Sequence, residues 1–180
     1  MPDIRHAPRR TTRRAHPEPR RRDEIASAVD CIRQLVRGLR LAEQRTHAES
    51  GLSAAQLFVL AQLSQSSAAS LSELAERTLT DRTSVAAVVE RLEAARLVTT
   101  RRDDEDRRKL LVCISPAGAE RLASAPVAPT AMLIDAMQRM QPAEVSAICR
   151  SLDRLLREMG LSGEPAGMLF EDAAAPRAGQ

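Results

Sequence analysis

Two short serine-led motifs in the middle of the chain constrain its fold most strongly. Ser53-Ala-Ala-Gln56 and Ser70-Leu-Ser-Glu73 both place a serine three residues before a Gln or Glu. In such a capping box the two side chains satisfy each other's free backbone N–H groups at the first turn of a helix. Each motif opens an apolar run, and Thr80 can cap a third short helix. The buried stripe of that third helix is predicted to be Val85, Val88, Val89 and Leu92.

The spacing of apolar residues changes after Leu97. Residues 98–102 and 110–114 are rich in β-forming side chains and are joined by a polar block, which predicts an antiparallel hairpin. The block contains four consecutive acids, at positions 103–106, between two arginine pairs. Taken alone, it could be a solvated turn, an acidic metal site, or the tip of an element that contacts phosphate.

Short helix, tight turn, helix and hairpin follow one another in the order of a winged helix-turn-helix. The second helix of such a pair lies in the DNA major groove, and the hairpin reaches the flanking backbone or minor groove. Here that second helix would span about residues 81–95. Arg82 and Ser84 stand near its N-terminal end, which suits a DNA backbone because helix N-termini attract phosphate.

Two narrow apolar seams predict longer helices toward the ends of the chain, over residues 24–47 and within 117–159. Pro126 and Pro129 are expected to bend or break the second of these stretches. Seams this narrow suit packing against another helix, either within the chain or across a dimer. We favour a dimer, because a small central domain cannot cover both seams. The predicted interface residues are Ile25, Val29, Ile32, Val36, Val145, Ile148, Leu152 and Leu155.

The two ends of the chain differ from its middle in composition. Residues 1–22 contain eight Arg beside Asp3 and Glu18 and almost no apolar residues, so a disordered tail of net charge +6 is predicted. Since the whole chain carries +3, residues 23–180 carry −3, and any basic surface there must be local. Residues 161–180 are rich in Gly, Ala and Pro and predict a flexible second tail. We therefore expect one mainly α domain over residues 23–160, with the winged helix-turn-helix and its small β-hairpin wing at about 52–116.

The motifs between Ser70 and Gly118 resemble those of the MarR family of bacterial transcription regulators, and the flanking helices extend the resemblance to roughly 24–160. A wing motif together with a recognition-helix motif at this distance is more specific than a lone helix-turn-helix. The matching residues are Leu74-Ala75-Glu76-Arg77, Asp81-Arg82-Thr83-Ser84-Val85, Arg91-Leu92-Glu93, Leu97-Val98, Asp106-Arg107-Arg108 and Ser115-Pro116-Ala117-Gly118.

Family members use an Asp in the wing to hold an Arg that enters the minor groove. The resemblance therefore implies that Asp106 orients Arg108, with Arg107 and Lys109 near phosphates. Alanines at 86 and 87 stand where the family often has a hydroxyl and a basic residue, so we expect fewer base contacts and more reliance on the wing. The predicted DNA-contacting residues are Ser70, Ser72, Thr80, Arg82, Thr83, Ser84, Ala87, Asp106, Arg107, Arg108 and Lys109.

The same resemblance implies a homodimeric regulator, usually a repressor, which a small-molecule effector releases from pseudo-palindromic double-stranded DNA. Three scattered cysteines and the lack of a long apolar run predict a cytoplasmic protein. His47 and Phe58 are the candidate effector contacts, and the chain has only two Phe and no Trp or Tyr. Two alternatives stay open: thiol-based sensing through Cys31, and a winged helix that binds a partner protein. The sequence contains no recognisable enzyme, cofactor, metal or membrane-spanning motif, so we expect neither catalysis nor a cofactor.

Overall fold

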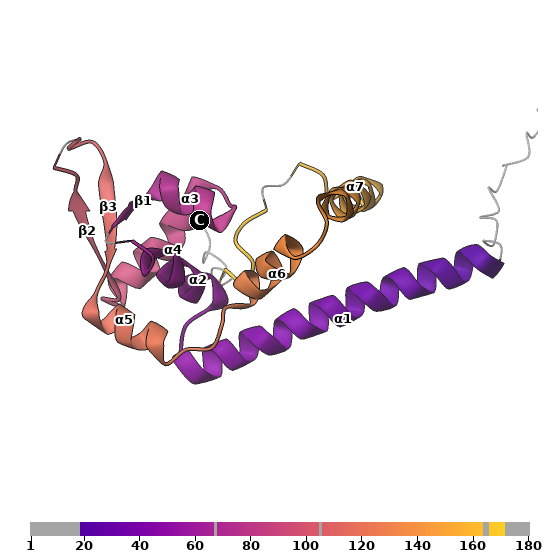
Figure 1. Cartoon of the computed structure of the whole chain (residues 1–180), viewed down its shortest axis with the longest axis horizontal. Helices are drawn as coiled ribbons and strands as arrows, with labels where there is room; N and C mark the ends of the chain where they lie inside the picture. Colours follow the sequence, from indigo (N-terminus) through magenta and orange to yellow (C-terminus); the bar gives the residue numbers. More distant parts are fainter. Residues whose placement is uncertain (1–18, 67, 105, 164–165, 172–180) are drawn as a thin grey trace, which may run out of the picture. The chain divides into compact units, whose positions relative to one another are not determined.

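The computed structural model describes residues 19–66, 68–104, 106–163 and 166–171 (Figure 1). Within these residues the chain is mostly helical, with a small antiparallel sheet, and the predicted fold class is confirmed. The chain divides into two compact units, the first ending at Gly38 and the second beginning at Leu39. The helices are α1 (Pro19–Ser50), α2 (Ala54–Leu63), α3 (Leu71–Thr78), α4 (Arg82–Ala94), α5 (Pro116–Ala123), α6 (Pro129–Gln138) and α7 (Pro142–Glu158), and the strands are β1 (Ala69–Ser70), β2 (Val98–Arg102) and β3 (Leu110–Ile114).

Both predicted capping boxes form. At the start of α2, the Gln56 N–H donates to Ser53 Oγ at 3.3 Å, and the Ser53 N–H donates to Gln56 Oε1 at 2.9 Å. At the start of α3, Ser70 and Glu73 exchange the corresponding bonds at 3.3 and 2.7 Å. These local bonds begin the two helices where the sequence predicted them.

The third helix is capped by Asp81 and not, as predicted, by Thr80. Asp81 accepts from the backbone N–H of Ser84 at 2.9 Å. The Thr80 N–H instead donates to Ala75 at the end of α3, just after Leu79, which takes a left-handed conformation with φ 54°. Thr80 therefore belongs to the end of α3, and the charged carboxylate of the next residue is the stronger acceptor for the free N–H groups of α4.

The core of the second unit forms around α2, in which seven of ten residues are buried. A helix with so many apolar residues belongs largely in the interior and not at a surface. The predicted stripe of α4 packs against it, together with residues from both long strands. The side chains with less than 2% exposure include Leu57, Val59, Leu60 and Leu63 of α2, Val85, Val88 and Leu92 of α4, and Val98 and Val112 of the sheet.

The sheet has the strand order β1-β3-β2, and both pairings are antiparallel. β2 and β3 are the predicted hairpin, with Val98 opposite Ile114 and Arg102 opposite Leu110. The two-residue strand β1 was not predicted, and its Ala69 pairs with Val112. This pairing joins the start of α3 to the wing, which we define as β2, β3 and their connecting turn.

The base of the wing is tightly joined to α5. The Ser115 N–H donates to the Leu97 carbonyl at 3.0 Å, and the Ser115 hydroxyl donates to the Arg96 carbonyl at 2.8 Å. Gly118 packs directly on Leu97, the residue that precedes β2, since a Cβ at position 118 would lie 2.1 Å from the Leu97 carbonyl oxygen. Position 118 therefore requires glycine for space and not for its backbone angles.

The C-terminal part of α1 belongs to the second unit. The carboxylate of Glu43 accepts from the Ala54 N–H at 3.0 Å, and the Arg121 guanidinium donates to the Ser50 carbonyl at 2.6 Å. These bonds fasten the end of α1 to the start of α2 and to the last turn of α5.

Both terminal predictions need correction. α1 begins at Pro19, so residues 19–22 are helical and not part of a disordered tail, whereas residues 1–18 lie outside the described part of the chain. Arginine is a good helix former, and proline is favoured at a first helical position. At the other end, Met168 is only 7% exposed and belongs to the core, so a flexible tail is wrong for residues 166–171.

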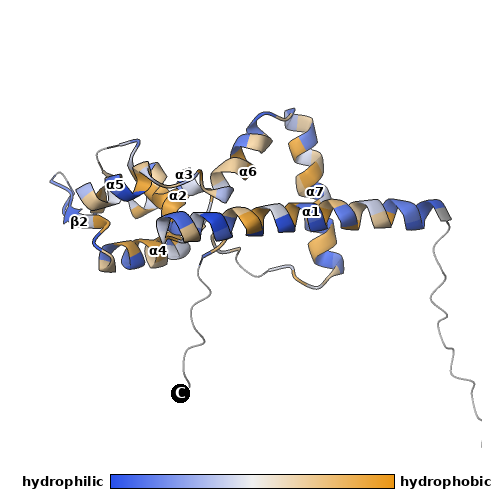
Figure 2. Cartoon of the chain, turned by 90° about the horizontal axis from the view of Figure 1, so that it is seen from below, coloured by the Kyte–Doolittle hydropathy of each residue, from blue (hydrophilic) through white to orange (hydrophobic). Residues whose placement is uncertain are grey.

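The apolar seams of α1 and α7 remain largely uncovered. Figure 2 shows apolar residues recurring along both helices. None of the α7 residues is buried, and Ile25 and Leu152 are 50% and 46% exposed. Val29, Ile32, Val36 and Leu155 are 37–41% exposed, and Val145 and Ile148 are partly exposed.

Candidate nucleic-acid interface

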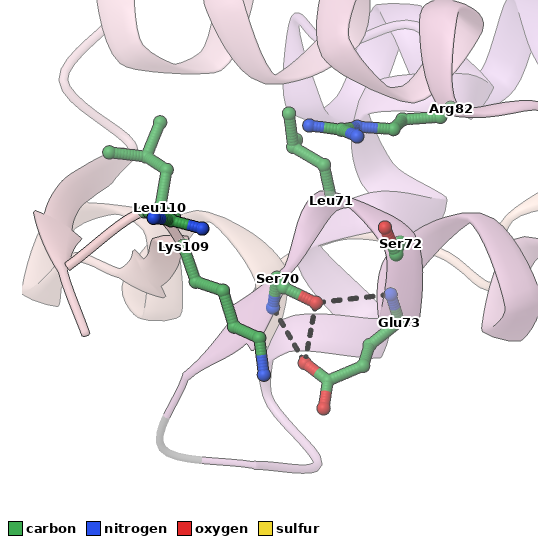
Figure 3. Close-up of a pocket in the computed structure, with 8 residues that line it drawn as sticks. Ser70, Leu71, Ser72, Glu73, Arg82, Lys109 and Leu110 are labelled. Carbon is green, nitrogen blue, oxygen red and sulfur yellow. Dashed lines mark hydrogen bonds between the residues drawn. The ribbon is translucent and has the colours of Figure 1, made fainter. Parts of the chain in front are cut away.

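A groove of about 500 Å³ lies where the starts of α3 and α4 meet the wing (Figure 3). Ser70 and Ser72 come from the start of α3, Arg82 from α4, and Arg108 and Lys109 from the wing. Five of the predicted DNA-contacting residues therefore line one surface. Leu71, Glu73 and Leu110 complete its lining.

The groove carries more positive than negative charge. Arg82, Arg108 and Lys109 are exposed, and Glu73 is the one carboxylate among its described lining residues. The Ser70 N–H and hydroxyl both donate to Glu73, at 2.7 and 2.9 Å. The backbone N–H is the main cause that lowers the pKa of Glu73, followed by the hydroxyl. Ser70 is thus committed to the cap of α3, and three cations against one carboxylate leave the groove with a net positive charge that can attract an anion.

The wing turn is ordered by backbone bonds to aspartates. Asp106 accepts from the Arg108 N–H at 3.1 Å, and the Asp106 N–H donates to Asp103 at 3.1 Å. The Asp103 N–H donates to the Lys109 carbonyl at 3.0 Å. Asp106 thus binds the backbone N–H of Arg108, whereas the family resemblance implied a bond to the Arg108 guanidinium. Asp106 shapes the turn that presents Arg108.

The outward face of α4 offers few hydrogen-bond donors. Arg82, Thr83 and Glu90 are exposed, whereas Ala86 and Ala87 are partly covered and have no polar side-chain atoms. The predicted contact Ser84 is engaged elsewhere, because its hydroxyl donates to Asp81 at 2.7 Å. This bond is the main cause that lowers the pKa of Asp81, followed by the backbone N–H of Ser84. The predicted contact Thr80 is also turned inward, with a buried hydroxyl that has no hydrogen-bond partner within the described structure.

Solved structures with a similar fold are transcription regulators. BldR from Sulfolobus solfataricus is 26% identical, with a TM-score of 0.50 over 76% of this chain and 96% of its own. AbsC from Streptomyces coelicolor, a MarR family regulator, is 19% identical, with a TM-score of 0.51 over 81% and 98%. A mutant MarR from E. coli, solved in complex with operator DNA, is 19% identical, with a TM-score of 0.51 over 74% and 96%.

Residues 50–109 match the sequence model described as the MarR family. The chain belongs to the MarR family of winged-helix transcription regulators. A search of curated proteins found no match. The three structures align over nearly their whole lengths but over only 74–81% of this chain, which therefore carries residues beyond the shared MarR fold.

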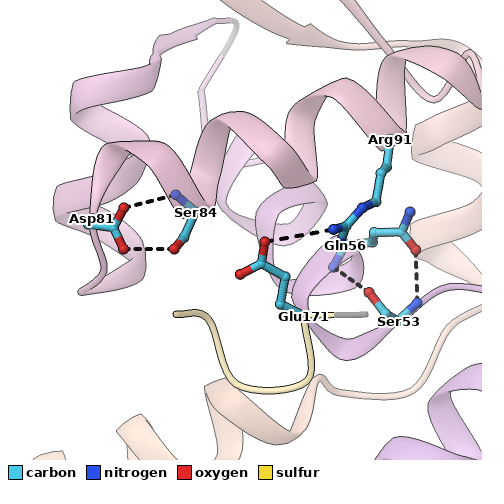
Figure 4. Close-up of polar contacts among 6 residues, drawn as sticks. All are labelled: Ser53, Gln56, Asp81, Ser84, Arg91 and Glu171. Atoms are coloured by element: carbon cyan, nitrogen blue, oxygen red, sulfur yellow. Dashed lines mark hydrogen bonds and ion pairs between the residues drawn. The ribbon is translucent and has the colours of Figure 1, made fainter. Parts of the chain in front are cut away.

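The recognition helix of this MarR-family chain is held on two flanks. On one flank, the Thr100 hydroxyl in β2 donates to Glu93 at 2.6 Å. On another, Arg91 Nη2 lies 3.8 Å from Glu171 Oε1 (Figure 4). Sequence reasoning missed Glu171, which follows the apolar triplet 168–170 in a segment read as flexible. That triplet was the only local signal that this segment could pack.

The residues considered for effector binding differ in their surroundings. Phe58 is 2% exposed and fills the core, so its ring is a packing residue in this conformation. His47 is exposed in the last turn of α1, and its carbonyl accepts from the Gly51 N–H at 2.8 Å. Cys31, the candidate redox residue, is an exposed free thiol on α1.

Across the described ranges, no three or more His, Cys, Asp or Glu side chains gather in an arrangement that could hold a metal ion. Within the same part of the chain, no helix combines the length and apolar character needed to cross a bilayer.

Proposed function

We propose that this MarR-family protein binds duplex DNA as a homodimer, with α4 in the major groove and the wing along the flanking minor groove. The observation that carries the proposal is the groove in which exposed Arg82, Arg108 and Lys109 come together from α4 and the wing. Phosphate contacts by Lys and Arg supply most sequence-independent affinity for DNA. A mutant MarR from E. coli, whose fold is similar, was solved in complex with operator DNA, which is consistent with a DNA-binding role for this fold.

The wing is proposed to contribute more to affinity than the base-facing side of α4. Alanines cannot donate to guanine, and Ala86 and Ala87 occupy the middle of that side. Arg108 is presented at the end of a turn that Asp106 orders through the Arg108 backbone. An arginine in a narrow minor groove reads DNA shape, so A/T-rich flanks should favour binding.

The uncovered seams of α1 and α7 support the dimer. Ile25 and Leu155, at 50% and 40% exposure, belong to rows of apolar residues that recur at helical spacing on the two helices. Burial of such rows against a second copy removes apolar surface from water. A two-fold dimer requires a pseudo-palindromic site, with half-sites about one helical turn or a multiple of it apart.

Release by a small-molecule effector, and with it a repressor role, completes the proposal. The site we propose lies near His47, at the junction of α1 with the winged domain. An effector there can act only by binding the DNA-competent and incompetent conformations with different affinity.

A salt titration tests the DNA-binding proposal. We compare the wild type with the triple variant Arg82→Ala, Arg108→Ala, Lys109→Ala on a random duplex, using fluorescence anisotropy from low to moderate salt. Loss of six positive charges per dimer from the DNA-facing surface should flatten the slope of log K against log salt by up to about five units.

The matched control removes three exposed arginines outside the groove: Arg139→Ala, Arg150→Ala and Arg154→Ala. It should leave the slope close to that of the wild type. Equal losses in both triple variants would show that affinity reflects total charge only. No binding by the wild type would favour the alternative that the winged helix binds a protein.

A further inference from the structure

The C-terminal residues 166–171, which we call the strap, pack beside the recognition helix. Met168 inserts into the core cluster that also contains Val85 and Val88 of α4, and it is 7% exposed. The strap then turns sharply, with the Glu171 N–H donating to the Met168 carbonyl at 3.1 Å and Phe170 at a φ of 58°. The turn brings the Glu171 side chain toward α4 (Figure 4).

The strap follows one flank of α4 over two turns of helix. Ser84 and Arg91 are seven residues apart, so they lie on the same side of the helix. A Cβ at Gly167 would be 3.7 Å from Ser84 Oγ and 3.1 Å from Glu171 Oε2. Glu171 itself approaches Arg91 at 3.8 Å. The strap therefore approaches α4 near its start and again toward its end.

The contact with Arg91 has an electrostatic reason. The side chains of Arg91 and Glu171 are 31% and 21% exposed, so both are largely removed from water. Arg91 Nη1 is buried and has no hydrogen-bond partner within the described structure. A partly buried guanidinium needs a nearby negative charge, and the Glu171 carboxylate supplies one.

The strap and the wing hold different sides of α4. Glu93, which accepts from Thr100 of the wing, lies two residues after Arg91 and so points about 200° around the helix from it. The face between these two flanks carries exposed Thr83 and Glu90. This is the face proposed to enter the major groove, and the strap leaves it open.

We propose that the strap positions the recognition helix for DNA, with Met168 and Glu171 as its two positioning residues. The inference rests on the proposed DNA-binding function and adds a role for residues that follow the dimerisation helix α7. When the strap is docked, α4 is held from both flanks and meets DNA already ordered. When it is absent, α4 must be ordered at the moment of binding, which lowers affinity.

Two truncations separate the strap from the residues that follow it. One variant ends at Gly163 and lacks the strap, and its matched control ends at Asp172 and keeps it. Hydrogen exchange of the α4 amides at 84–91 and anisotropy with a duplex are measured on both variants and on the wild type. Circular dichroism shows that each variant is folded.

Loss of the strap should speed exchange of these α4 amides by about tenfold or more, the factor expected when a buried Met side chain is removed. DNA affinity should fall roughly three- to thirtyfold, a size typical of residues that act on a site without contacting it. The variant ending at Asp172 should match the wild type in both measurements.

Point variants test the two positioning residues. Met168→Ala should reproduce most of the exchange effect, whereas Leu169→Ala, at a position that is 42% exposed, should not. Glu171→Gln should weaken DNA binding, and the charge exchange Arg91→Glu with Glu171→Arg should restore part of the loss. A purely steric role would show no such restoration and would overturn the role of Glu171.

Failure of the positioning role and failure of DNA binding itself give different results in these experiments. A wild type that binds no duplex would refute DNA binding itself. Wild-type binding that strap removal leaves unchanged, or strengthens, would overturn the positioning role alone. Unchanged exchange in α4 after strap removal would show that the strap does not hold the helix.

Discussion

Replacement of Gly118 by alanine should destabilise the winged domain through a steric clash at the base of the wing. The added Cβ would lie 2.1 Å from the Leu97 carbonyl oxygen and 3.1 Å from a side-chain carbon of Ile114. Both neighbours are held, because Leu97 accepts from the Ser115 N–H and Ile114 pairs with Val98 in the sheet. The backbone must therefore move by about 1 Å to reach an ordinary contact distance.

Overpacking of this kind lowers the free energy of unfolding by about 1–3 kcal/mol, and the better helix propensity of alanine offsets about 1 kcal/mol of this loss. Because the clash is with backbone and not with a flexible side chain, we expect a net loss of about 2 kcal/mol. For a chain of this size that loss lowers Tm by about 4–8 °C. It should also weaken DNA binding, since Leu97 leads directly into the first strand of the wing.

Gly38→Ala is the matched control, because a Cβ at Gly38 meets no atom within 4 Å and the residue lies inside α1. The same substitution there should stabilise the protein by about 0.5–1 kcal/mol. Urea unfolding and thermal melts are compared at one protein concentration, because a dimer's stability depends on concentration. Equal effects of the two substitutions, or a stabilised Gly118→Ala, would refute the steric reasoning.

Three further predictions follow from the same structure. Arg108→Ala should weaken binding to duplexes with A/T-rich flanks by about 1–3 kcal/mol and to G/C-rich flanks by less, and equal losses in a competition assay would restrict the wing to phosphate contacts. Hydrogen bonds from Ser84 lower the pKa of Asp81 below its ordinary value of 3.8. The stabilisation of α4 by this cap is therefore fully present above pH 3.8 and is lost as the pH falls through the lowered pKa. The free energy of unfolding should therefore be lower for Asp81→Asn than for the wild type above pH 3.8, and the difference should shrink at lower pH in an acid-unfolding titration. Ile32→Asp combined with Leu152→Asp should produce monomers in sedimentation experiments, and an unchanged dimer would place the interface elsewhere.

The elements that sequence reasoning predicted are those specified by local chemistry. Ser53 and Ser70 each find their partner three residues away, so the capping boxes were visible without any tertiary information. The hairpin was equally visible, since Val98–Arg102 and Leu110–Ile114 are neighbours in sequence and their turn is polar. The helical order and the wing followed from these local signals.

The features that were missed depend on contacts distant in sequence or on competition between neighbours. β1 exists because Ala69 pairs with Val112, and two residues carry no recognisable strand pattern of their own. Thr80 was predicted as the cap of the third helix because the left-handed turn at Leu79 could not be foreseen. The strap was predicted to be flexible because residues 161–180 as a whole are rich in Gly, Ala and Pro, whereas its position depends on the burial of Met168 against distant core residues.

Only five of the predicted DNA-contacting residues line the groove, and this affects how the protein can recognise DNA. The Ser70 and Ser84 hydroxyls are engaged by Glu73 and Asp81, and the Thr80 hydroxyl is buried. The groove keeps its three cations, while the outward face of α4 carries Thr83 and the carboxylate of Glu90.

A carboxylate in the major groove can accept hydrogen bonds only from base amino groups, and phosphates repel it. Glu90 is therefore expected to lower affinity for most DNA sequences more than it raises affinity for a preferred one. Arg82, Arg108 and Lys109 are indifferent to base identity when they bind phosphate. Selectivity by such a surface must come from rejection along α4 and from the shape of the minor groove under Arg108. Changes in the flanks of an operator should therefore alter affinity as strongly as changes in the bases that face α4.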